Sequence, residues 1–394
     1  MRFPEFKGEW NDTRLKDLCK FLSGGTPSID NVEYWEGDIP FVSAIAMHDT
    51  HIEKTPLHLT EKGVSNGSKQ LKAGNLLLLV RGSMLWNKIP ICYNDVDVAF
   101  NQDVKGIIPN SNTTSLFLLN WIQSHENKIK YMVTGTGIGA GKLDSEDLLA
   151  LNVKLPSLNE QKKIEKFLSL IDERITTQIR IIEKLQSLMK GLNDYLQESA
   201  TLSYTLSFSD IGEDYSGLSG KSADDFGSGK PYITYVSVYS CTFVDDNCCA
   251  MVSVAPDERQ NVVLNGDMLF TLSSETPEEV CYGAVYNGNE KEIYLNSFCF
   301  GVRNTEGKVY SPYMAYFFNS SRFRREVYPL AQGSTRFNLQ KSDFLSKKFA
   351  LPTKNEQRKI FKILNAYDKK IKAEKLILAQ YQLQKEYLLR NLFI

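Results

Sequence analysis

Two stretches of the sequence decide the fold, because one is a near copy of the other. Residues 155–175 read LPSLNEQKKIEKFLSLIDERI, and residues 351–371 read LPTKNEQRKIFKILNAYDKKI. The offset is 196 residues (351 − 155), and each copy places a Ser or Thr three residues before a Glu, as in Ser157 and Glu160. This spacing is a capping box, in which the two side chains satisfy free backbone N–H groups at a helix start. The copies therefore predict two matching helices, one in the middle of the chain and one at its end.

Each predicted helix carries an apolar stripe along its length. Its residues recur in alternating steps of three and four, and an average step of 3.5 keeps one seam on one partner, as in a coiled coil. A polar residue interrupts the middle of each stripe, Gln178 and Glu374, and such a residue fixes register at a cost in stability. If the helices pair antiparallel about their centres, these two side chains meet. The seam positions that we select are Ile164, Leu168, Ile175, Gln178, Ile182, Ile360, Leu364, Ile371, Glu374 and Leu378.

The rest of the chain forms two similar globular segments, each followed by one of the helices. Landmarks recur at offsets of 192 to 196 residues, for example Gly74 with Gly266 and Asn101 with Asn296. We therefore predict an α/β (α+β) protein: two similar mixed α/β domains related by pseudo-two-fold symmetry, separated by two long helices in an antiparallel coiled coil. The predicted boundaries are 1–154 and 199–350 for the domains, and 155–198 and 351–394 for the helical spacers.

Short apolar runs bounded by Gly, Pro, Asn or Asp predict the strands of both domains. Residues 113–132 are expected to form one helix, because their apolar side chains lie on one face. Ser311 and Pro312 are expected to open another helix, as N-cap and first helical residue. The predicted strands are 39–46, 76–80, 89–93 and 104–108 in the first domain, and 232–238, 268–272, 280–286 and 298–302 in the second.

Composition and charge narrow the class of protein. The chain has 394 residues, 42% hydrophobic and 24% charged, as in a globular protein of two or three domains. No apolar run approaches the roughly 20 residues that span a bilayer, and no secretion signal opens the sequence, so we expect a cytoplasmic protein without membrane contact. The seven cysteines have no Cys-x-x-Cys spacing, so no metal site is expected. The net charge is −1 and neither domain is basic, which predicts modest counterion release if this chain alone binds DNA.

Several motifs resemble those of one family of DNA-recognition proteins. The most specific is the helix-opening Leu-Pro-x-x-Asn-Glu-Gln, and four shorter motifs agree with it. These are RFPEFKGEW at 2–10, SGGTPS at 23–28, GDIPFVS at 37–43 and LSGKS at 218–222. Over the whole chain the pattern resembles the specificity (S) subunit of type I restriction–modification enzymes. The resemblance implies two target-recognition domains, each reading one half of an asymmetric, bipartite site in double-stranded DNA.

The same resemblance implies partners and assigns the chemistry to them. It implies that the helical spacer binds two adenine methyltransferase (M) subunits and, through the complex, the restriction (R) subunits. No cofactor is expected in this chain, because S-adenosylmethionine, ATP and Mg²⁺ would belong to the partners. The expected role is therefore non-catalytic: the chain directs adenine methylation or restriction by other subunits.

The sequence contains no catalytic constellation of its own. Residues 135–142 read GTGIGAGK, but two positions of a Walker motif are not filled, and the run follows a predicted helix rather than a strand. We interpret it as a flexible loop that contacts DNA together with its counterpart at 333–338. Neither a methyltransferase motif of the Asn-Pro-Pro-aromatic type nor a nuclease centre is present. Two alternatives stay open: a coiled-coil interaction adaptor without DNA contact, and a self-contained DNA methyltransferase or nuclease with degenerate motifs.

For base readout we select polar and aromatic residues at predicted strand ends and in the loops that follow. Arg or Lys suits guanine, and Asn or Gln suits adenine. In the first domain these residues are Ser43, His48, Arg81, Ser83, Trp86, Asn87, Lys88, Asn101, Gln102 and Lys142. In the second domain they are Thr234, Tyr235, Ser237, Tyr239, Ser273, Ser274, Asn296, Ser297, Thr335 and Arg336. We expect Arg322, Arg324 and Arg325 either to contact phosphate or to lie on a solvated face of their helix.

Overall fold

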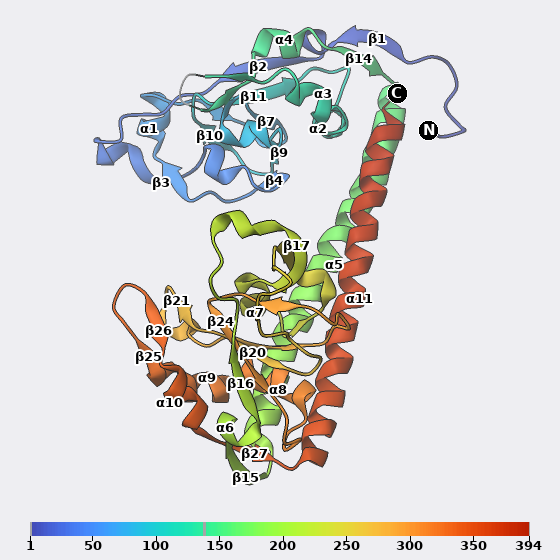
Figure 1. Cartoon of the computed structure of the whole chain (residues 1–394). Coiled ribbons are helices and arrows are strands. Elements are labelled where there is room, and N and C mark those ends of the chain that lie inside the picture. Colours follow the sequence, from blue (N-terminus) through green and yellow to red (C-terminus); the bar gives the residue numbers. More distant parts are fainter. Residues whose placement is uncertain (1, 137–138, 394) are drawn as a thin grey trace. The chain divides into compact units, whose positions relative to one another are not determined.

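The computed structural model describes residues 2–136 and 139–393, and the chain divides into two compact units (Figure 1). The first unit consists of Met1–Ile179 with Leu376–Ile394, and the second consists of Arg180–Lys375. Each unit therefore contains one globular domain together with part of the middle helix and part of the C-terminal helix.

Both repeated stretches form the long helices that the sequence predicts. Helix α5 spans Leu158–Ser199 and helix α11 spans Lys354–Leu392. In the first unit the early part of α5 packs against the late part of α11, so the two run antiparallel, and Lys385 Nζ lies 2.6 Å from a carboxylate oxygen of Asp172. The helix residues in the core of this unit are Ile164, Leu168, Ile171, Leu388 and Leu392.

The second unit repeats the antiparallel packing with the other halves of the helices. Ile360 and Leu364 of α11 lie in its core, and Met189, Leu192 and Leu196 of α5 pack against that core. The antiparallel pairing of the predicted fold is therefore confirmed within each unit. Among the described residues, no helix combines the length and apolarity needed to cross a membrane.

The selected seam positions follow the predicted stripe. Ile175 and Leu378 are half-buried. The other eight positions are buried, including the polar Gln178 and Glu374, which are 6% and 7% exposed. That these two side chains meet each other stays a prediction. The eight buried positions are Ile164, Leu168, Gln178, Ile182, Ile360, Leu364, Ile371 and Glu374.

The first domain is built on a five-stranded sheet of order β2-β11-β7-β9-β4, antiparallel except for the pairing of β4 with β9. These strands are β2 (Cys19–Ser23), β11 (Val104–Pro109), β7 (Leu76–Leu79), β9 (Ile91–Asn94) and β4 (His51–Ile52). A second sheet has the order β5-β3-β10-β6, and two smaller sheets have the orders β1-β14 and β12-β13-β8. Their strands are β5 (Leu57–Leu59), β3 (Trp35–Val42), β10 (Val98–Phe100), β6 (Gln70–Leu71), β1 (Asn11–Arg14), β14 (Asn152–Leu155), β12 (Thr134–Gly135), β13 (Gly141–Lys142) and β8 (Arg81–Gly82). The helices are α1 (Glu61–Ser65), α2 (Ser115–Ser124), α3 (Glu126–Lys130) and α4 (Ser145–Leu149).

The second domain repeats this arrangement strand for strand in its main sheet, whose order is β16-β24-β20-β22-β18. These strands are β16 (Glu213–Ser216), β24 (Cys299–Arg303), β20 (Met268–Thr271), β22 (Gly283–Tyr286) and β18 (Phe243–Val244). The smaller sheets have the orders β19-β17-β23, β15-β27 and β21-β26-β25. Their strands are β19 (Cys249–Val252), β17 (Phe226–Ile233), β23 (Tyr294–Leu295), β15 (Leu202–Ser207), β27 (Lys348–Pro352), β21 (Ser273–Ser274), β26 (Phe337–Leu339) and β25 (Ala331–Gln332). The helices are α6 (Phe208–Ile211), α7 (Tyr235–Ser240), α8 (Ser311–Phe318), α9 (Ser321–Val327) and α10 (Lys341–Ser346).

Several predicted elements differ from the structure, among them the strand expected over 280–286, which begins only at Gly283. The helix expected over 113–132 is two helices, α2 and α3, because the chain breaks at His125, whose ring stacks on Trp121 at 4.4 Å. The strand expected over 232–238 ends at Ile233 and continues as α7, since the Thr234 hydroxyl caps that helix. The strand expected over 39–46 likewise ends at residue 42. At His125 a ring contact and at Thr234 a side-chain cap outweigh the helix or strand propensity of the run.

The start of α8 differs by one residue from the expectation. Tyr310, not Ser311, is the N-cap, and Pro312 is the second helical residue. The Ser311 hydroxyl instead accepts a hydrogen bond from Asn304 Nδ2 at 3.3 Å.

The motif that opens both long helices has a role beyond the predicted cap. The cap itself forms in part: Ser157 Oγ accepts from the Glu160 N–H at 3.4 Å, whereas the Glu160 carboxylate accepts two hydrogen bonds from Arg2 at 2.7 and 2.9 Å. The next residue is the fully buried glutamine of Asn-Glu-Gln. Gln161 Nε2 donates to the carbonyl of the motif's proline at 2.9 Å, and Gln357 makes the same bond in the second copy at 2.9 Å. The motif thus anchors the start of each helix to the residues that precede it.

Candidate nucleic-acid interface

The first domain gathers its selected residues around the small sheet of β8, β13 and β12. Arg81 of β8 lies directly opposite Lys142 of β13, and Lys142 lies opposite Thr134 of β12. Residues directly opposite each other in a sheet place their side chains on the same face. Arg81 and Lys142 are both exposed, and Lys142 Nζ lies 3.7 Å from an Asp144 carboxylate oxygen. Two neighbouring cations on one face can bind phosphate or the acceptor edge of guanine.

Hydrogen bonds bring two further segments to this sheet. The Val80 N–H, one residue before β8, donates to the Asp103 carbonyl at 2.8 Å, so the turn at 101–103 adjoins the strand. Trp86 ends the short helical turn Ser83–Trp86, and its indole Nε1 donates to the Gly139 carbonyl at 3.0 Å. That bond holds the turn against the glycine-rich loop between β12 and β13. Residues 137 and 138 of this loop lie outside the described residues.

The loop after β3 completes the same edge. The Asn101 N–H donates to the Val42 carbonyl at 3.0 Å, which places residue 43 beside the 101–103 turn. Lys88 Nζ lies 3.5 Å from the His48 carbonyl. The structure therefore brings together, from four segments of the chain, Ser43, His48, Arg81, Ser83, Trp86, Asn87, Lys88, Asn101, Gln102 and Lys142.

The ten side chains differ in how much the fold itself uses them. Asn101 is 9% exposed and its Oδ1 accepts the Asp103 N–H at 3.1 Å, so it shapes the turn. Gln102 is exposed and its Oε1 accepts from Thr26 Oγ1 at 2.7 Å, while Ser43 and Lys88 are half-buried. The exposed members are His48, Arg81, Ser83, Trp86, Asn87, Gln102 and Lys142.

The second domain builds an equivalent edge with β21 and β26 in the places of β8 and β13. Ser273 lies opposite Asn338, and the Asn296 N–H donates to the Ile233 carbonyl at 3.0 Å, as Asn101 does to Val42. Asn296 Oδ1 then accepts the Phe298 N–H at 2.9 Å, which repeats the first domain's turn. The two edges therefore share their backbone hydrogen bonds.

Most selected side chains of the second domain are engaged within the protein. Thr234 Oγ1 accepts the Ser237 N–H at 3.1 Å, and Tyr235 OH donates to the Ser273 carbonyl at 2.6 Å. Tyr239 OH donates to Glu279 at 2.5 Å, and this carboxylate is the main cause that raises the pKa of Tyr239 to about 12. The buried members are Ser273 and Ser274, the half-buried members are Thr234, Tyr235, Ser237, Tyr239 and Asn296, and the exposed members are Ser297, Thr335 and Arg336.

The structure adds apolar residues that the sequence reasoning passed over. Phe298 is 53% exposed, and the Arg336 guanidinium lies 5.6 Å from its ring centre. Ile45 and Val236 occupy equivalent positions in the two domains, two residues after Ser43 and Thr234, and are 70% and 66% exposed. An exposed aromatic or aliphatic side chain can contact a base or the methyl group of thymine. In the sequence, Phe298 directly follows the selected Ser297, and Ile45 and Val236 lie two residues after Ser43 and Thr234.

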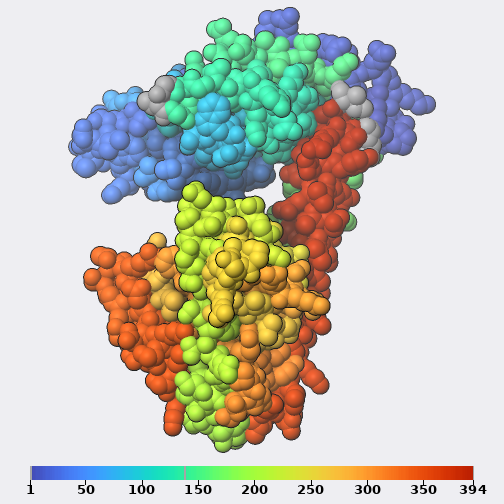
Figure 2. Space-filling model, viewed as in Figure 1, coloured from blue at the N-terminus to red at the C-terminus, as the bar shows by residue number. Residues whose placement is uncertain are grey.

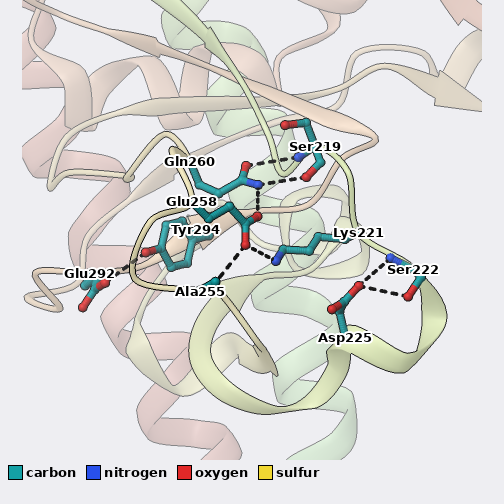
Figure 3. A network of polar contacts seen from close by, with 9 residues as sticks. All are labelled: Ser219, Lys221, Ser222, Asp225, Ala255, Glu258, Gln260, Glu292 and Tyr294. Carbon is teal, nitrogen blue, oxygen red and sulfur yellow. Dashed lines mark hydrogen bonds and ion pairs between the residues drawn. The ribbon is translucent and has the colours of Figure 1, made fainter.

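A polar network fixes one loop of the second domain (Figure 3). Lys221, 7% exposed in its side chain, donates to Glu258 at 2.5 Å. Gln260 links the same carboxylate to Ser219, whose N–H it accepts at 3.1 Å and whose carbonyl it contacts at 2.8 Å. The preceding residue, Leu218, donates its N–H to the Leu295 carbonyl at 2.7 Å. The motif LSGKS is thereby held beside the Asn296 turn.

The arginines of α9 are bound within the protein rather than presented as a free face. Arg322 donates to the carbonyls of Gln197 and Ala350, and Arg324 donates to those of Cys281 and Val280. Neither guanidinium is therefore available as an unengaged phosphate contact. Arg325 is exposed and pairs with Glu198 at 2.6 Å.

Known proteins share this repeated arrangement of two domains and two helices. The family model described as "Type I restriction modification DNA specificity domain" matches residues 7–187 and 210–381, one match for each half of the repeat. The chain belongs to this family. The expected resemblance to type I specificity subunits is therefore confirmed.

Relatives agree with that assignment. The specificity subunit of the Escherichia coli type I restriction enzyme EcoR124I/EcoR124II is 31% identical over 174 residues, which cover 44% of this chain and 43% of that protein. This chain thus spans less than half the length of that relative. The Methanocaldococcus jannaschii MjaVIII specificity subunit is 25% identical over 394 residues, a match that covers 95% of this chain and 89% of that protein.

A solved structure shares the fold. It is described as giving the structural basis of complex assembly and conformational transition of the type I R-M system, and it matches 99% of this chain and 98% of its own with a TM-score of 0.63 at 15% identity. Two mixed α/β domains with long helices are thus the fold of this family, as the sequence predicts. The matched relatives are specificity subunits, which are non-catalytic.

Proposed function

We propose that this chain is a non-catalytic specificity subunit whose two domains each read one half of an asymmetric, bipartite DNA site. One observation carries the proposal: the two domains present equivalent edges, built on the same backbone hydrogen bonds, with different side chains. A reader that repeats its frame and varies its side chains can address two different short sequences with one geometry. In this proposal the domains are 1–154 and 199–350, and the spacers are 155–198 and 351–394.

The exposed side chains suggest how each half-site is read. In the first domain, Arg81 and Lys142 supply adjacent donors suited to guanine O6 and N7, and Asn87 and Gln102 suit adenine. In the second, Arg336 is the exposed cation beside the hydroxyls of Ser297 and Thr335. Side chains such as Asn101 and Thr234, which the fold uses itself, position these readers and do not contact bases.

The long helices support partner binding by this chain. Large apolar side chains on both helices face solvent, and contiguous exposed apolar surface marks sites of protein association. Figure 2 shows α11, in red, at the molecular surface. We propose that the exposed helix residues of each unit bind one of two methyltransferase subunits and, through the complex, restriction subunits, which would hold S-adenosylmethionine, ATP and Mg²⁺. The most exposed of these side chains are Leu188, Tyr195, Leu376, Leu383 and Tyr387.

The test is to co-express the full chain with a candidate methyltransferase subunit and map adenine methylation across the host genome. The expected result is one split, asymmetric motif that disappears when this chain is omitted. Methylation or cleavage by the purified chain with cofactor alone would favour a self-contained enzyme. Co-purification with the partner, but no DNA footprint, would favour an interaction adaptor. Exchanging residues 199–350 for those of a relative should change one half of the motif and leave the other.

A further inference from the structure

A cavity of 810 Å³ lies within the second unit, where α5 and α11 meet the second domain. Its volume falls in the range of small-molecule sites, about 300–1,000 Å³. Helix α5 contributes Met189 and Asn193, and helix α11 contributes Asp368, Lys372 and Lys375. Residues three and four apart lie on one face of a helix, so each helix turns a single face toward this space. The DNA-reading edge described above does not include any of these residues.

The lining of this cavity is strongly cationic. Five of its residues are Lys or Arg, and Asp368 is the one carboxylate among the described residues that line it. Asp368 is paired with Lys372 at 3.2 Å, and Arg325 is paired with Glu198 outside the lining at 2.6 Å, so two of the five cations have a carboxylate partner. Positive charge gathered in a partly enclosed space attracts and concentrates anions. The five cations are Lys190, Arg324, Arg325, Lys372 and Lys375.

One of these cations, Arg324, is half-buried and makes its hydrogen bonds to backbone carbonyls. The Arg324 guanidinium donates to the carbonyls of Cys281 at 2.9 Å and Val280 at 2.6 Å, and it lies 4.5 Å from the ring centre of Tyr282. Burial lowers the pKa of Arg324 from its ordinary value. Carbonyls and a ring orient the guanidinium but leave its net charge in place, so the wall of the cavity remains positive.

A buried hydroxyl in the same wall points to the same chemistry. Tyr316 lines the cavity and is 1% exposed, and its hydroxyl has no hydrogen-bond partner among the described residues. A buried hydroxyl without a partner is unfavourable, because it has lost water and gained nothing in return. An oxygen atom of a bound anion would accept its hydrogen bond.

The first unit contains an equivalent cavity that lacks this charge. Its volume is 320 Å³, and Ile175, Gln382 and Lys385 occupy the positions of Ile371, Gln186 and Met189, all at an offset of 196 residues. Two cations and two carboxylates line it, which sum to zero. The scaffold alone therefore does not produce an anion site. The charged residues that line the cavity of the first unit are Lys385, Arg390, Glu126 and Glu386.

We propose that the cavity of the second unit binds a phosphate-bearing small molecule of about nucleotide size. Its phosphate groups lie among Lys190, Lys372 and Lys375, and the Tyr316 hydroxyl donates to one of their oxygens. The apolar part of the ligand packs against Phe243 and Met189 of the same wall. This site is independent of the DNA-reading edges and does not rest on the proposed function.

The test is calorimetric titration of the full chain with ATP and, separately, with inorganic phosphate at fixed ionic strength. We expect one ATP per chain and weaker binding of phosphate, both weakened by added salt. The double variant Lys190→Ala/Lys375→Ala should bind ATP at least tenfold more weakly. Tyr316→Phe, which removes one hydroxyl and keeps the ring, should weaken it about threefold.

A matched control separates the site from general surface charge. Lys184→Ala/Lys369→Ala removes two exposed lysines from the same helices outside the cavity, and should leave the ATP affinity unchanged. Equal affinity in both double variants, or no binding of either probe at millimolar concentration, would overturn the proposal. So would loss of a co-expressed methyltransferase subunit from Lys190→Ala/Lys375→Ala without any ATP or phosphate binding, since the cavity would then hold a protein segment.

Discussion

The two edges that we propose to read DNA share a backbone frame and differ in their side chains. In the first domain the small sheet presents Arg81 opposite Lys142, whereas in the second the corresponding strands place buried Ser273 opposite Asn338. Both domains hold their edges through the same hydrogen bond, from Asn101 or Asn296 to the end of a neighbouring strand. The frame therefore fixes where a side chain is offered, and the residue at each position decides what it can bind.

The buried hydrogen bonds next to the two edges also differ between the domains. In the second domain Asp267, 2% exposed, accepts hydrogen bonds from Tyr215 OH at 2.7 Å and Arg303 Nη2 at 2.8 Å. In the first domain the fully buried Asn94 takes this supporting role, and its Oδ1 accepts the Asn75 N–H at 2.9 Å. One domain thus rests on a charged network and the other on neutral amides, which predicts different responses to mutation.

The largest difference is expected at this charged network. Asp267→Asn keeps the shape of the side chain but leaves the Arg303 guanidinium without its charge partner. Breaking a buried ion pair costs about 3–5 kcal/mol, and the one-third exposure of Arg303 reduces this to roughly 2–3 kcal/mol. Denaturant unfolding of the full chain, with hydrogen exchange to locate the loss, should place it in the second domain. Asn75, the counterpart of Asp267 by position, donates from its side-chain Nδ2 to the Lys72 carbonyl at 3.0 Å, so Asn75→Ala should cost less than about 1 kcal/mol, and an equal loss from both variants would contradict the contrast.

The helix-opening glutamines should instead respond alike. Gln161→Leu and Gln357→Leu each leave a buried proline carbonyl without its donor, at roughly 2 kcal/mol per site. Hydrogen exchange at the starts of α5 and α11 would measure the two losses. A loss at one site more than about 1 kcal/mol greater than at the other would show that the repeated motif is not used equally.

The reading edges should separate in their effect on DNA. If the proposed function holds, Arg81→Ala and Arg336→Ala should each weaken discrimination at their own half-site by about tenfold, near 1.4 kcal/mol, and leave the other half-site unchanged. Methylation maps with the partner subunit measure both halves at once. As a control, Lys20→Ala removes an exposed cation from the opposite end of the main sheet and should change neither half.

The smallest difference is expected in the response to acid. His125 occupies the N-cap position of α3 without a side-chain cap, whereas the Ser320 hydroxyl caps α9, and burial lowers the pKa of His125. The unfolded chain then binds the proton more readily than the folded one, so this residue's contribution to stability is present above pH 6.5 and is lost as the pH falls. Between pH 7.5 and 5.5 the first unit should lose about 1–3 °C in Tm that His125→Ser does not lose. Identical pH profiles of the two proteins would remove this contrast.

Much of the architecture was predictable because its signals are local. The helices α5 and α11 begin and continue where the capping motif and the 3.5-residue repeat place them, and the buried leucines of β7 form a strand as their run predicts. The predictions failed where a single side chain redirects the backbone, as the Thr234 hydroxyl does at α7 and the His125 ring does between α2 and α3. Such contacts leave no periodic pattern in the sequence.

The candidate site was predictable in part. Sequence position alone selected residues at strand ends, and the structure brings those of the first domain to one edge. It could not show that Arg336, in the loop before β26, stays exposed while Ser273, which follows the apolar strand β20, is buried. Exposure depends on what other segments pack over a residue. The cationic cavity was not foreseen at all, since its lysines lie on two helices far apart in the chain.

The sequence by itself determined that this protein is a tandem repeat with two long, capped, seam-bearing helices, since capping and periodicity act over a few residues of one chain segment. Only the tertiary structure decided which polar groups remain available. Arg81 lies opposite Lys142 because segments distant in sequence pair in one sheet. Contacts of the same kind place the Tyr316 hydroxyl among cations without a hydrogen-bond partner among the described residues. Those contacts arise when the folded chain encloses each side chain on every side, and no single segment encodes them.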